Sequence, residues 1–388
     1  MPHSTPDLME CLSRLIAIPS VSSVQPQYDQ TNIHVIHLLA EWLSALGFEV
    51  EIMPLPNQPQ KANLIATLGK GPGGLVLSGH TDTVPFDADR WQSDPFTLTE
   101  RDNRLYGLGS ADMKSFMGIA IEAARQFDPK KFTAPLILLA TADEESSMEG
   151  AISLVNADKP RAKYAIIGEP TGLVPIRAHK GIIMESIRVI GRAGHSSNPA
   201  HGNSALEGMH KVMQAILNWR TELQAQHQDK TFTVPYPTLN LGHVHGGDNP
   251  NRICGECDLH IDLRPLPGMS TDNLREQLDQ RIAQALHDTD LKFERTPLIH
   301  GTEPMFTDAN AEIVRCAEEL TGHSAQSVAY CTEAPYMNQL GMQTIVMGPG
   351  HIEQAHQPDE YLDMEQIQPA VDLISKMINR FCIQPDAK

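Results

Sequence analysis

The sequence is poor in cysteine, in positive charge and in long apolar runs. Six scattered cysteines in 388 residues do not make a disulfide framework, so we expect a reducing, cytoplasmic compartment. Residues 1–7 are polar and lack the charged-then-apolar layout of a signal peptide. No apolar run approaches the roughly 20 residues that cross a bilayer. Lysine and arginine total 30 against 48 acids, which argues against nucleic acid and membrane as partners.

One cysteine pair, Cys254-Gly255-Glu256-Cys257, has the CxxC spacing of redox motifs and of half a zinc ribbon. No second pair completes a ribbon. The flanking residues are typical of a strand, which favours packing in the core or at a sheet edge.

Three apolar runs of strand length, at residues 75–79, 136–142 and 164–168, end in histidine or acid. Each run is typical of a strand buried on both faces of a parallel sheet. The carboxyl ends of such strands share one edge, where sites form. A buried turn histidine or solvated acids would explain any single run, but three together favour a site. The residues brought to that edge are His80, Asp82, Glu144, Glu145 and Glu169.

Asp82 lies two positions after His80, and in an extended chain such residues point to the same side. A metal-bound imidazole usually has its second nitrogen oriented by an acceptor. We therefore expect Asp82 to orient the ring of His80.

The predicted fold is α/β, with a mostly parallel sheet flanked by helices and an inserted α+β domain with an antiparallel sheet. From about residue 180 the runs 182–190 and 257–263 alternate apolar and polar residues, which indicates a sheet with one wet face. The predicted domains are 1–179, 180–293 and 294–388, where the first and last segments form one catalytic domain.

Two acids stand where helices are expected to begin. Asp29 or a neighbour is predicted to cap a helix over residues 33–46. Asp112 is predicted to open another helix, and an acid there is often only a cap. The glycine loop at 107–109 before Asp112 would also let a ligand approach, so its role depends on the neighbouring strand ends.

A strand predicted at 344–347 is followed by two histidines that compete for one role, His351 and His356. His356 precedes a proline and two acids, in a rigid loop suited to fixing a ligand. We therefore favour His356.

This inventory of two imidazoles and three carboxylates suits zinc or a similar divalent ion. Five side chains are too many for one tetrahedral site that also holds water. Two ions about 3.5–4 Å apart, bridged by one carboxylate, use them all. Glu144 precedes a ligand and is suited to act as a general base. The predicted ligands are His80, Asp112, Glu145, Glu169 and His356.

Five motifs, in order over essentially the whole chain, resemble those of the dinuclear zinc aminoacylase and carboxypeptidase superfamily. Four further stretches resemble one branch of it, whose members deacetylate an amino acid. The five motifs are His80-Thr81-Asp82-Thr83-Val84-Pro85, Ala111-Asp112-Met113-Lys114, Asp143-Glu144-Glu145, Gly168-Glu169-Pro170-Thr171 and His356-Gln357-Pro358-Asp359-Glu360. The four stretches are residues 178–181, 234–242, 264–268 and 330–335.

The resemblance implies hydrolysis of a small acylated amino acid by a metal-bound hydroxide, with Glu144 as the base. It implies two zinc ions per subunit, for which cobalt can substitute. Asp112 is the shared ligand. One ion is assigned to His80, Asp112 and Glu169, and the other to Asp112, Glu145 and His356.

The resemblance also implies that the inserted domain is a lid that dimerises, so we expect a homodimer. It implies that His195 stabilises the oxyanion and that Asn251 and Arg264 hold the substrate carboxylate. For Arg264 a surface ion pair is the alternative. Glu333 is the candidate anion for a substrate ammonium group.

Two other readings stay open. A desuccinylase or dipeptidase could use the same scaffold, and a catalytically silent metal-binding or partner-binding domain could carry the same ligands. Glu144 argues against the silent domain, because a structural site has no use for a spare base.

Overall fold

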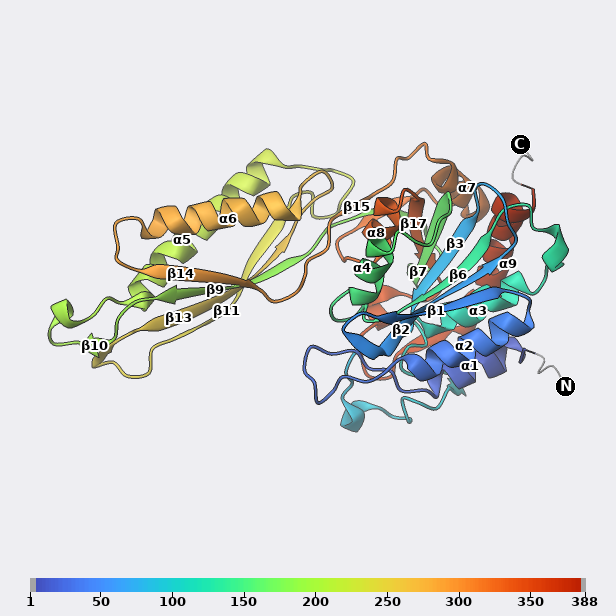
Figure 1. Cartoon of the computed structure of the whole chain (residues 1–388), viewed down its shortest axis with the longest axis horizontal. Coiled ribbons are helices and arrows are strands. Elements are labelled where there is room, and N and C mark those ends of the chain that lie inside the picture. The colour runs from blue at the N-terminus through green and yellow to red at the C-terminus, as the bar shows by residue number, and fades with distance from the viewer. Residues whose placement is uncertain (1–4, 385–388) are drawn as a thin grey trace. The chain divides into compact units, whose positions relative to one another are not determined.

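The computed structural model of the protein describes residues 5–384, which form two compact units (Figure 1). Unit 1 comprises the described residues of Met1–Arg177, Phe306–Gln326 and Thr332–Lys388. Unit 2 comprises Ala178–Met305 and Ser327–Cys331. Each unit has its own hydrophobic core. The α/β class, with a mostly parallel sheet and a separate antiparallel sheet, is confirmed.

The main sheet has the strand order β1-β2-β6-β3-β7-β17-β8-β15, with β16 paired to β8. The inner pairs β6–β3, β3–β7 and β7–β17 are parallel, whereas β1–β2, β2–β6 and β17–β8 are antiparallel. A small sheet has the order β18-β5-β4. The strands are β1 (Glu49–Leu55), β2 (Gln58–Leu68), β3 (Leu75–His80), β4 (Thr99–Arg101), β5 (Arg104–Tyr106), β6 (Leu136–Thr141), β7 (Tyr164–Pro170), β8 (Ile176–His179), β15 (Met305–Phe306), β16 (Gln326–Val328), β17 (Gln343–Gly348) and β18 (Tyr361–Asp363).

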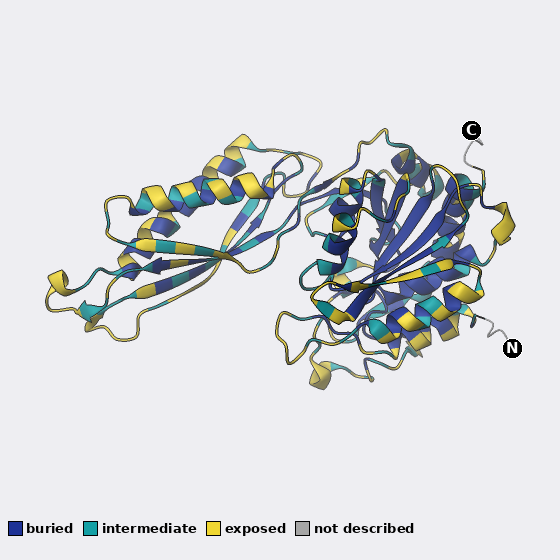
Figure 2. Cartoon of the chain, in the orientation of Figure 1, coloured by how far each residue is buried: buried dark blue, intermediate teal, exposed yellow. Residues whose placement is uncertain are grey.

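Helices cover both faces of this sheet, and α4 and α8 lie on the side opposite α3 and α9 (Figure 1). Every residue of β3, β6 and β7 is therefore buried, as Figure 2 shows. This explains why the three runs are apolar throughout rather than alternating. The helices are α1 (Leu8–Ile16), α2 (Ile33–Ala45), α3 (Lys114–Ala124), α4 (Glu149–Asn156), α7 (Glu312–Thr321), α8 (Ala334–Gln339) and α9 (Ile367–Ile378).

The helix starts differ from the predictions. Asp29 does not cap α2, whose N-cap is Asn32, and its carboxylate instead accepts from Lys61 Nζ at 2.6 Å. Asp112 does not cap α3, which begins at Lys114 without a side-chain cap. The carboxylates of both acids interact with side chains that are distant in the sequence. Residue preferences at helix starts do not take such contacts into account. The carboxylate of Asp112 is thus left for the site described below.

Unit 2 is a four-stranded antiparallel sheet with the order β11-β13-β9-β14. Figure 1 shows α5 and α6 side by side on one face of it. The other face is wet, which gives β9 and β13 their alternating burial. The elements are β9 (Ile183–Ile190), β10 (Gly194–His195), α5 (Ala205–Gln226), β11 (Thr238–Gly246), β12 (Arg252–Ile253), β13 (Glu256–Arg264), α6 (Thr271–Leu286) and β14 (Lys292–Pro297).

The CxxC cysteines lie in this unit and are free. Cys257 is buried on β13, and Cys254 Sγ lies 3.0 Å from the carbonyl of Glu256. They pack as predicted. Among the described residues, no helix has both the length and the apolar character needed to cross a membrane.

Candidate metal centre

Three neighbouring parallel strands deliver the central residues of the site to one edge of the main sheet. β3 lies between β6 and β7, and their pairing register places their carboxyl ends together. His80 is the last residue of β3, Glu169 lies at the end of β7, and Glu144 and Glu145 follow β6. The structure therefore brings together the residues that the apolar runs indicated.

Asp112 lies between the two histidines. Its Oδ1 is 3.0 Å from His80 Nε2, and its Oδ2 is 3.4 Å from His356 Nε2. Glu169 Oε1 is 3.9 Å from His80 Nε2, so Glu169 belongs to the His80 side. The two oxygens of one carboxylate thus face two different imidazoles, which is the arrangement that a bridging ligand needs.

The second side of the centre pairs His356 with Glu145. Both carboxylate oxygens of Glu145 lie 3.1 Å from His356 Nε2. His351 does not take this place, because its Nε2 lies 2.8 Å from the side-chain nitrogen of Gln366.

The ring of His80 is oriented by the residue predicted to do so, but through a different atom. His80 Nδ1 lies 3.0 Å from the carbonyl oxygen of Asp82, so this nitrogen donates and Nε2 faces the carboxylates. The Asp82 carboxylate lies 3.7 Å from Nδ1 and accepts instead from the backbone N–H of Glu145 at 3.0 Å. Asp82 therefore links the β3 end to the loop after β6.

The crowded acids change the protonation of the centre. Burial, and then the carboxylates of Glu145, Asp112 and Asp82, raise the pKa of Glu144 well above its usual value. Burial and the carboxylates of Asp112 and Glu144 do the same to the pKa of Glu169. Burial opposes the ionisation of Asp112, but the hydrogen bonds of His356 and His80 bring its pKa below the usual value. The carboxylates of this cluster outnumber its two histidines, so added positive charge would favour their ionisation.

The donor set fits divalent metal ions. His80, Asp112 and Glu145 each offer one ligand atom, and these atoms lie within 4.8 Å of one another. The same holds for His80, Glu144 and Glu169. Imidazole nitrogens and carboxylate oxygens are the ligands of hydrolytic zinc and related centres. The described residues therefore hold a candidate His, Asp and Glu metal site.

Sequence reasoning missed Glu360, which holds the loop that carries Asp112. Its carboxylate accepts backbone N–H groups from Gly109 at 3.0 Å, Ala111 at 2.8 Å and Asp112 at 2.9 Å. The side chain is 2% exposed. Burial and the nearby Asp112 raise the pKa of Glu360 to about 8. Its place at the end of the His356-Gln-Pro-Asp-Glu motif was the available signal.

A buried ion triad, also missed, holds the loop after β6. Lys61 Nζ lies 2.6 Å from both Asp29 and Asp143, and Lys61 is only 2% exposed. Ser22 Oγ donates to Asp143 at 2.7 Å. Asp143 directly precedes Glu144, so these contacts fix the start of the loop that presents the two glutamates. A lysine within a strand was the only signal in the sequence.

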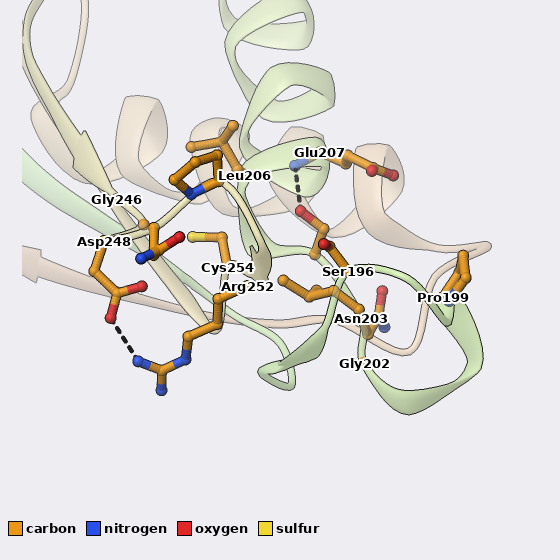
Figure 3. A pocket seen from close by; sticks show the side chains of 15 residues that line it. Ser196, Pro199, Gly202, Asn203, Leu206, Glu207, Gly246, Asp248, Arg252 and Cys254 are labelled. Atoms are coloured by element: carbon orange, nitrogen blue, oxygen red, sulfur yellow. Dashed lines mark hydrogen bonds and ion pairs between the residues drawn. The ribbon is translucent and has the colours of Figure 1, made fainter.

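Two predicted residues of unit 2, His195 and Asn251, are neighbours. Strand β10 pairs with β12, and Ser196 N–H donates to the carbonyl of Asn251 at 3.0 Å. His195 Nδ1 accepts from Ser197 N–H at 3.2 Å, which leaves Nε2 to carry the proton. Ser196 also lines a cavity of about 680 Å³ beside the start of α5 (Figure 3). His195 can therefore act as a hydrogen-bond donor.

The remaining predicted residues have partners. Arg264 of β13 pairs with Asp262, with Nε 2.9 Å from Oδ1, which is the surface ion pair considered as the alternative. Glu333 is 1% exposed and accepts from Ser78 Oγ, and burial raises its pKa. The roles of both residues toward a substrate stay predictions.

Solved structures of other proteins share this fold. Aminopeptidase PepT from Bacillus cereus is similar with a TM-score of 0.74 and 19% identity, over 97% of this chain and 99% of that one. A dinuclear metal binding peptidase from Bacillus subtilis is similar with a TM-score of 0.66 and 13% identity, over 95% and 96%. These likenesses show the shared fold.

Sequence comparison gives the family. Residues 76–380 match peptidase family M20/M25/M40, and the chain belongs to this family. It is 48% identical to an acetylornithine deacetylase of Pasteurella multocida, over 97% of this chain and 98% of the relative. It is 49% identical to one of Salmonella paratyphi B, over 98% and 100%. The predicted resemblance to deacetylases is confirmed, and the protein is an amidohydrolase.

Proposed function

We propose that the protein hydrolyses N2-acetyl-L-ornithine to L-ornithine and acetate, a step of arginine biosynthesis. The observation that carries this proposal is the identity of 48–49% to acetylornithine deacetylases over nearly the full length of both chains. The cluster of histidines and carboxylates at the strand ends supports it, because metal ions held by such residues can activate water for amide hydrolysis.

Two zinc ions are the proposed cofactors, and cobalt is expected to substitute. His80, Asp112 and Glu169 would hold one ion, and Asp112, Glu145 and His356 the other. The support is that Asp112 turns one oxygen to each histidine. When bound, the ions would lower the pKa of a water molecule and polarise the acetyl carbonyl.

Glu144 is the proposed general base. It lies beside the ligands His80 and Glu169 without any hydrogen-bond partner among the described residues. Burial raises the pKa of its carboxyl group, which suits a group that accepts a proton and then gives it up. Glu144 would take the proton from the attacking water and pass it to the leaving nitrogen of ornithine. Asp82 would hold His80 and Glu145 in place during this transfer.

His195 is proposed to stabilise the oxyanion that develops on the acetyl oxygen. Its support is the Nε2 proton, which the hydrogen bond at Nδ1 leaves available for donation. Asn251 and Arg264 are proposed to bind the α-carboxylate, for which the planar fork of arginine is well shaped. Glu333 is the proposed partner of the side-chain ammonium group.

We further propose that unit 2 acts as a lid and as the dimerisation domain of a cytoplasmic homodimer. The predicted lid of residues 180–293 would extend to all of unit 2, because a boundary at 293 divides β14, and unit 1 would form the catalytic domain predicted at residues 1–179 and 294–388. Light scattering of the purified chain, compared with a variant that lacks residues 180–304, tests the dimerisation part.

The decisive experiment measures amine release by the purified full chain from three substrates. These are N2-acetylornithine, N-succinyl-diaminopimelate and a dipeptide. We expect the largest kcat/KM on acetylornithine, complete loss with a chelator and recovery with zinc or cobalt. Faster turnover of the succinyl compound or the dipeptide would move the proposal to those substrates. Absence of turnover on all three substrates after zinc loading would favour the alternative of a metal-binding or partner-binding protein without catalytic activity.

A further inference from the structure

Three histidines meet on the open face of the sheet of unit 2. His243 and His245 stand two residues apart on β11, and His260 stands on the neighbouring strand β13 directly across from His243. The ring centroids of His243 and His260 are 4.7 Å apart, and those of His243 and His245 are 6.5 Å apart. This His cluster plays no part in the proposed hydrolysis.

A β-bulge in β11 creates the His cluster. Up to Leu241 the register pairs each residue of β11 in sequence with β13, but Gly242 is then an extra residue, and His243 opposes His260. On β13 the residues Leu259 and Ile261 are buried, whereas His260 points to the open face. Without the bulge, His243 would oppose Leu259 and face the side covered by the helices. Bulges re-aim side chains in this way, often at sheet edges.

The rings are close enough to reach one metal ion after side-chain rotation. Three imidazoles that bind zinc tetrahedrally at Zn–N distances of about 2.0–2.1 Å hold their ring centroids about 5 Å apart. His243 lies 4.7 Å from His260 and 6.5 Å from His245, measured between ring centroids. The structure does not bring one nitrogen of each ring within 4.8 Å of the others, so the rings must turn to share an ion. His243 and His245 are exposed, and exposed side chains change rotamer quickly.

The rings are free of hydrogen bonds within the described part of the chain, and the acid beside them is already paired with an arginine. Among residues 5–384, none of the three rings makes a hydrogen bond. Asp258 opposes His245 in the register and interacts electrostatically with His245 and His260. Its carboxylate also pairs with Arg188 at 2.7 Å, which offsets the positive charge that Arg188 brings to this face.

We propose that His243, His245 and His260 bind one Zn²⁺ or a similar transition-metal ion, separately from the centre in unit 1. Three histidines with an open fourth position are an established zinc ligand set, and imidazole also suits copper and nickel. Binding would tie β11 to β13 beyond the bulge. From this point the chain runs directly through residues 247–250 to Asn251, so the ion would stiffen the segment that carries this residue.

The test counts zinc ions in the metal-free full chain by titration against a chromogenic chelator. We expect one zinc equivalent more in the wild type than in His243→Ala, His245→Ala or His260→Ala. The matched control is His210→Ala, an exposed histidine on α5 of the same unit, which should keep the full count. The readout is a difference of one equivalent, so it does not depend on whether the protein hydrolyses acetylornithine.

NMR of the histidine rings identifies the ligands directly. Once unit 1 is saturated, further zinc should shift the ring signals of three histidines. Each single variant should lack one of these three signals, and the other two should shift less. Equal zinc counts in the wild type and all three variants would overturn the proposal. Loss of one zinc equivalent in the His210→Ala control would also overturn the proposal.

Discussion

The two units keep their polar side chains in different places. In unit 1 the parallel strands are buried on both faces, so polar groups concentrate where the strands end. In unit 2 the sheet has one wet face, and every second residue of β13 is partly exposed. A histidine or acid that ends an apolar run is therefore informative in unit 1. The same residue in an alternating strand of unit 2 is ordinary, and its role must be found from its neighbours.

The units also bury charge in opposite senses. Unit 1 places one cation, Lys61, between two acids, Asp29 and Asp143. Unit 2 places one acid, Glu185, between Arg275 and Arg295, at 2.7 and 2.8 Å. Glu185 is completely buried. Only the triad of unit 1 holds a loop that carries residues of the metal centre, so the comparison predicts different consequences when each is broken.

The largest expected effect concerns Glu144. Glu144→Gln removes the proposed proton carrier and keeps the size of the side chain, so kcat on acetylornithine should fall about 10²–10⁴-fold. Zinc content should stay at the wild-type value, because Glu144 is not a proposed ligand. Glu353→Gln, an exposed glutamate close in sequence to His356, is the control and should be fully active. A Glu144→Gln variant within tenfold of wild-type kcat would remove Glu144 from its role.

The two buried triads should respond alike in stability and differently in metal binding. Lys61→Ala removes the cation that pairs with buried Asp143, and Glu185→Ala removes the acid that Arg275 and Arg295 share, although Arg295 keeps its pair with Asp279. Each change should lower the free energy of unfolding, by up to about 3–5 kcal/mol. Urea unfolding, followed separately for each unit by a reporter fluorophore, measures this loss. Zinc affinity should fall only in Lys61→Ala, because only that triad holds the Glu144 loop. Equal zinc affinities in the two variants would break the comparison.

His195 is an exposed residue at the end of β10 in unit 2 and should matter only during turnover. His195→Ala removes a proposed oxyanion donor, an effect of about 2.7–4 kcal/mol, so kcat should fall about 10²–10³-fold. Zinc content and thermal stability should not change. His201→Ala, in the segment after β10, is the matched control. Unchanged kcat in His195→Ala would place this histidine outside the active site.

Glu360 should affect metal binding through the loop that it holds. Glu360→Gln replaces one of the two acceptor oxygens by an NH2 group, which cannot accept a backbone N–H. The loop therefore loses at least one of its three hydrogen bonds, and Asp112 is held less firmly. Groups that support ligands in this way typically contribute 10–100-fold in metal affinity, and we expect a loss of about that size. Chelator competition measures it, and circular dichroism of the metal-free variant checks folding. A folded variant with wild-type zinc affinity would contradict this role.

The last expected effect is a pH dependence. Hydrogen bonds with Asp112 and Glu145 raise the pKa of His356 to about 10 in the metal-free protein, so the ring carries a proton at pH 7. Zinc must displace that proton, and its affinity should therefore rise with pH up to about pH 10. The metal-free fold should change in the opposite direction. A raised folded-state pKa gives stability that is complete below about pH 6.5 and is lost as pH rises toward 10.

Calorimetry in two buffers of different ionisation enthalpy measures the proton release at pH 7. We expect net release on zinc binding, together with tighter binding at pH 8 than at pH 6. Zinc affinity that stays constant between these pH values would show that His356 does not hold a displaceable proton.

Much of the centre could be predicted from the sequence because its strands are buried on both faces. An apolar run that stops at His80 or Glu169 marks both the strand and its end, and parallel packing then brings the ends together. Asp112 and His356 follow loops, so only the need for further ligands and the resemblance to a known superfamily identified them.

The residues that were missed are held by contacts between distant parts of the chain. Lys61 and Asp143 are separated by 82 positions, and Glu360 and Asp112 by 248. Such pairs have no local pattern. For the same reason the prediction that Asp29 or a neighbour caps α2 was wrong for Asp29, whose partner is Lys61, and the N-cap is Asn32. The bulge at Gly242 is equally invisible in sequence, because one extra residue changes the side that β11 turns to solvent.

Anomalous diffraction at the zinc edge from crystals of the zinc-loaded protein tests the central claim most directly. The account predicts two peaks about 3.5–4 Å apart in unit 1, with the carboxylate of Asp112 between them and His80 and His356 on opposite sides. A single peak among these residues, or two peaks that do not share Asp112, would contradict it.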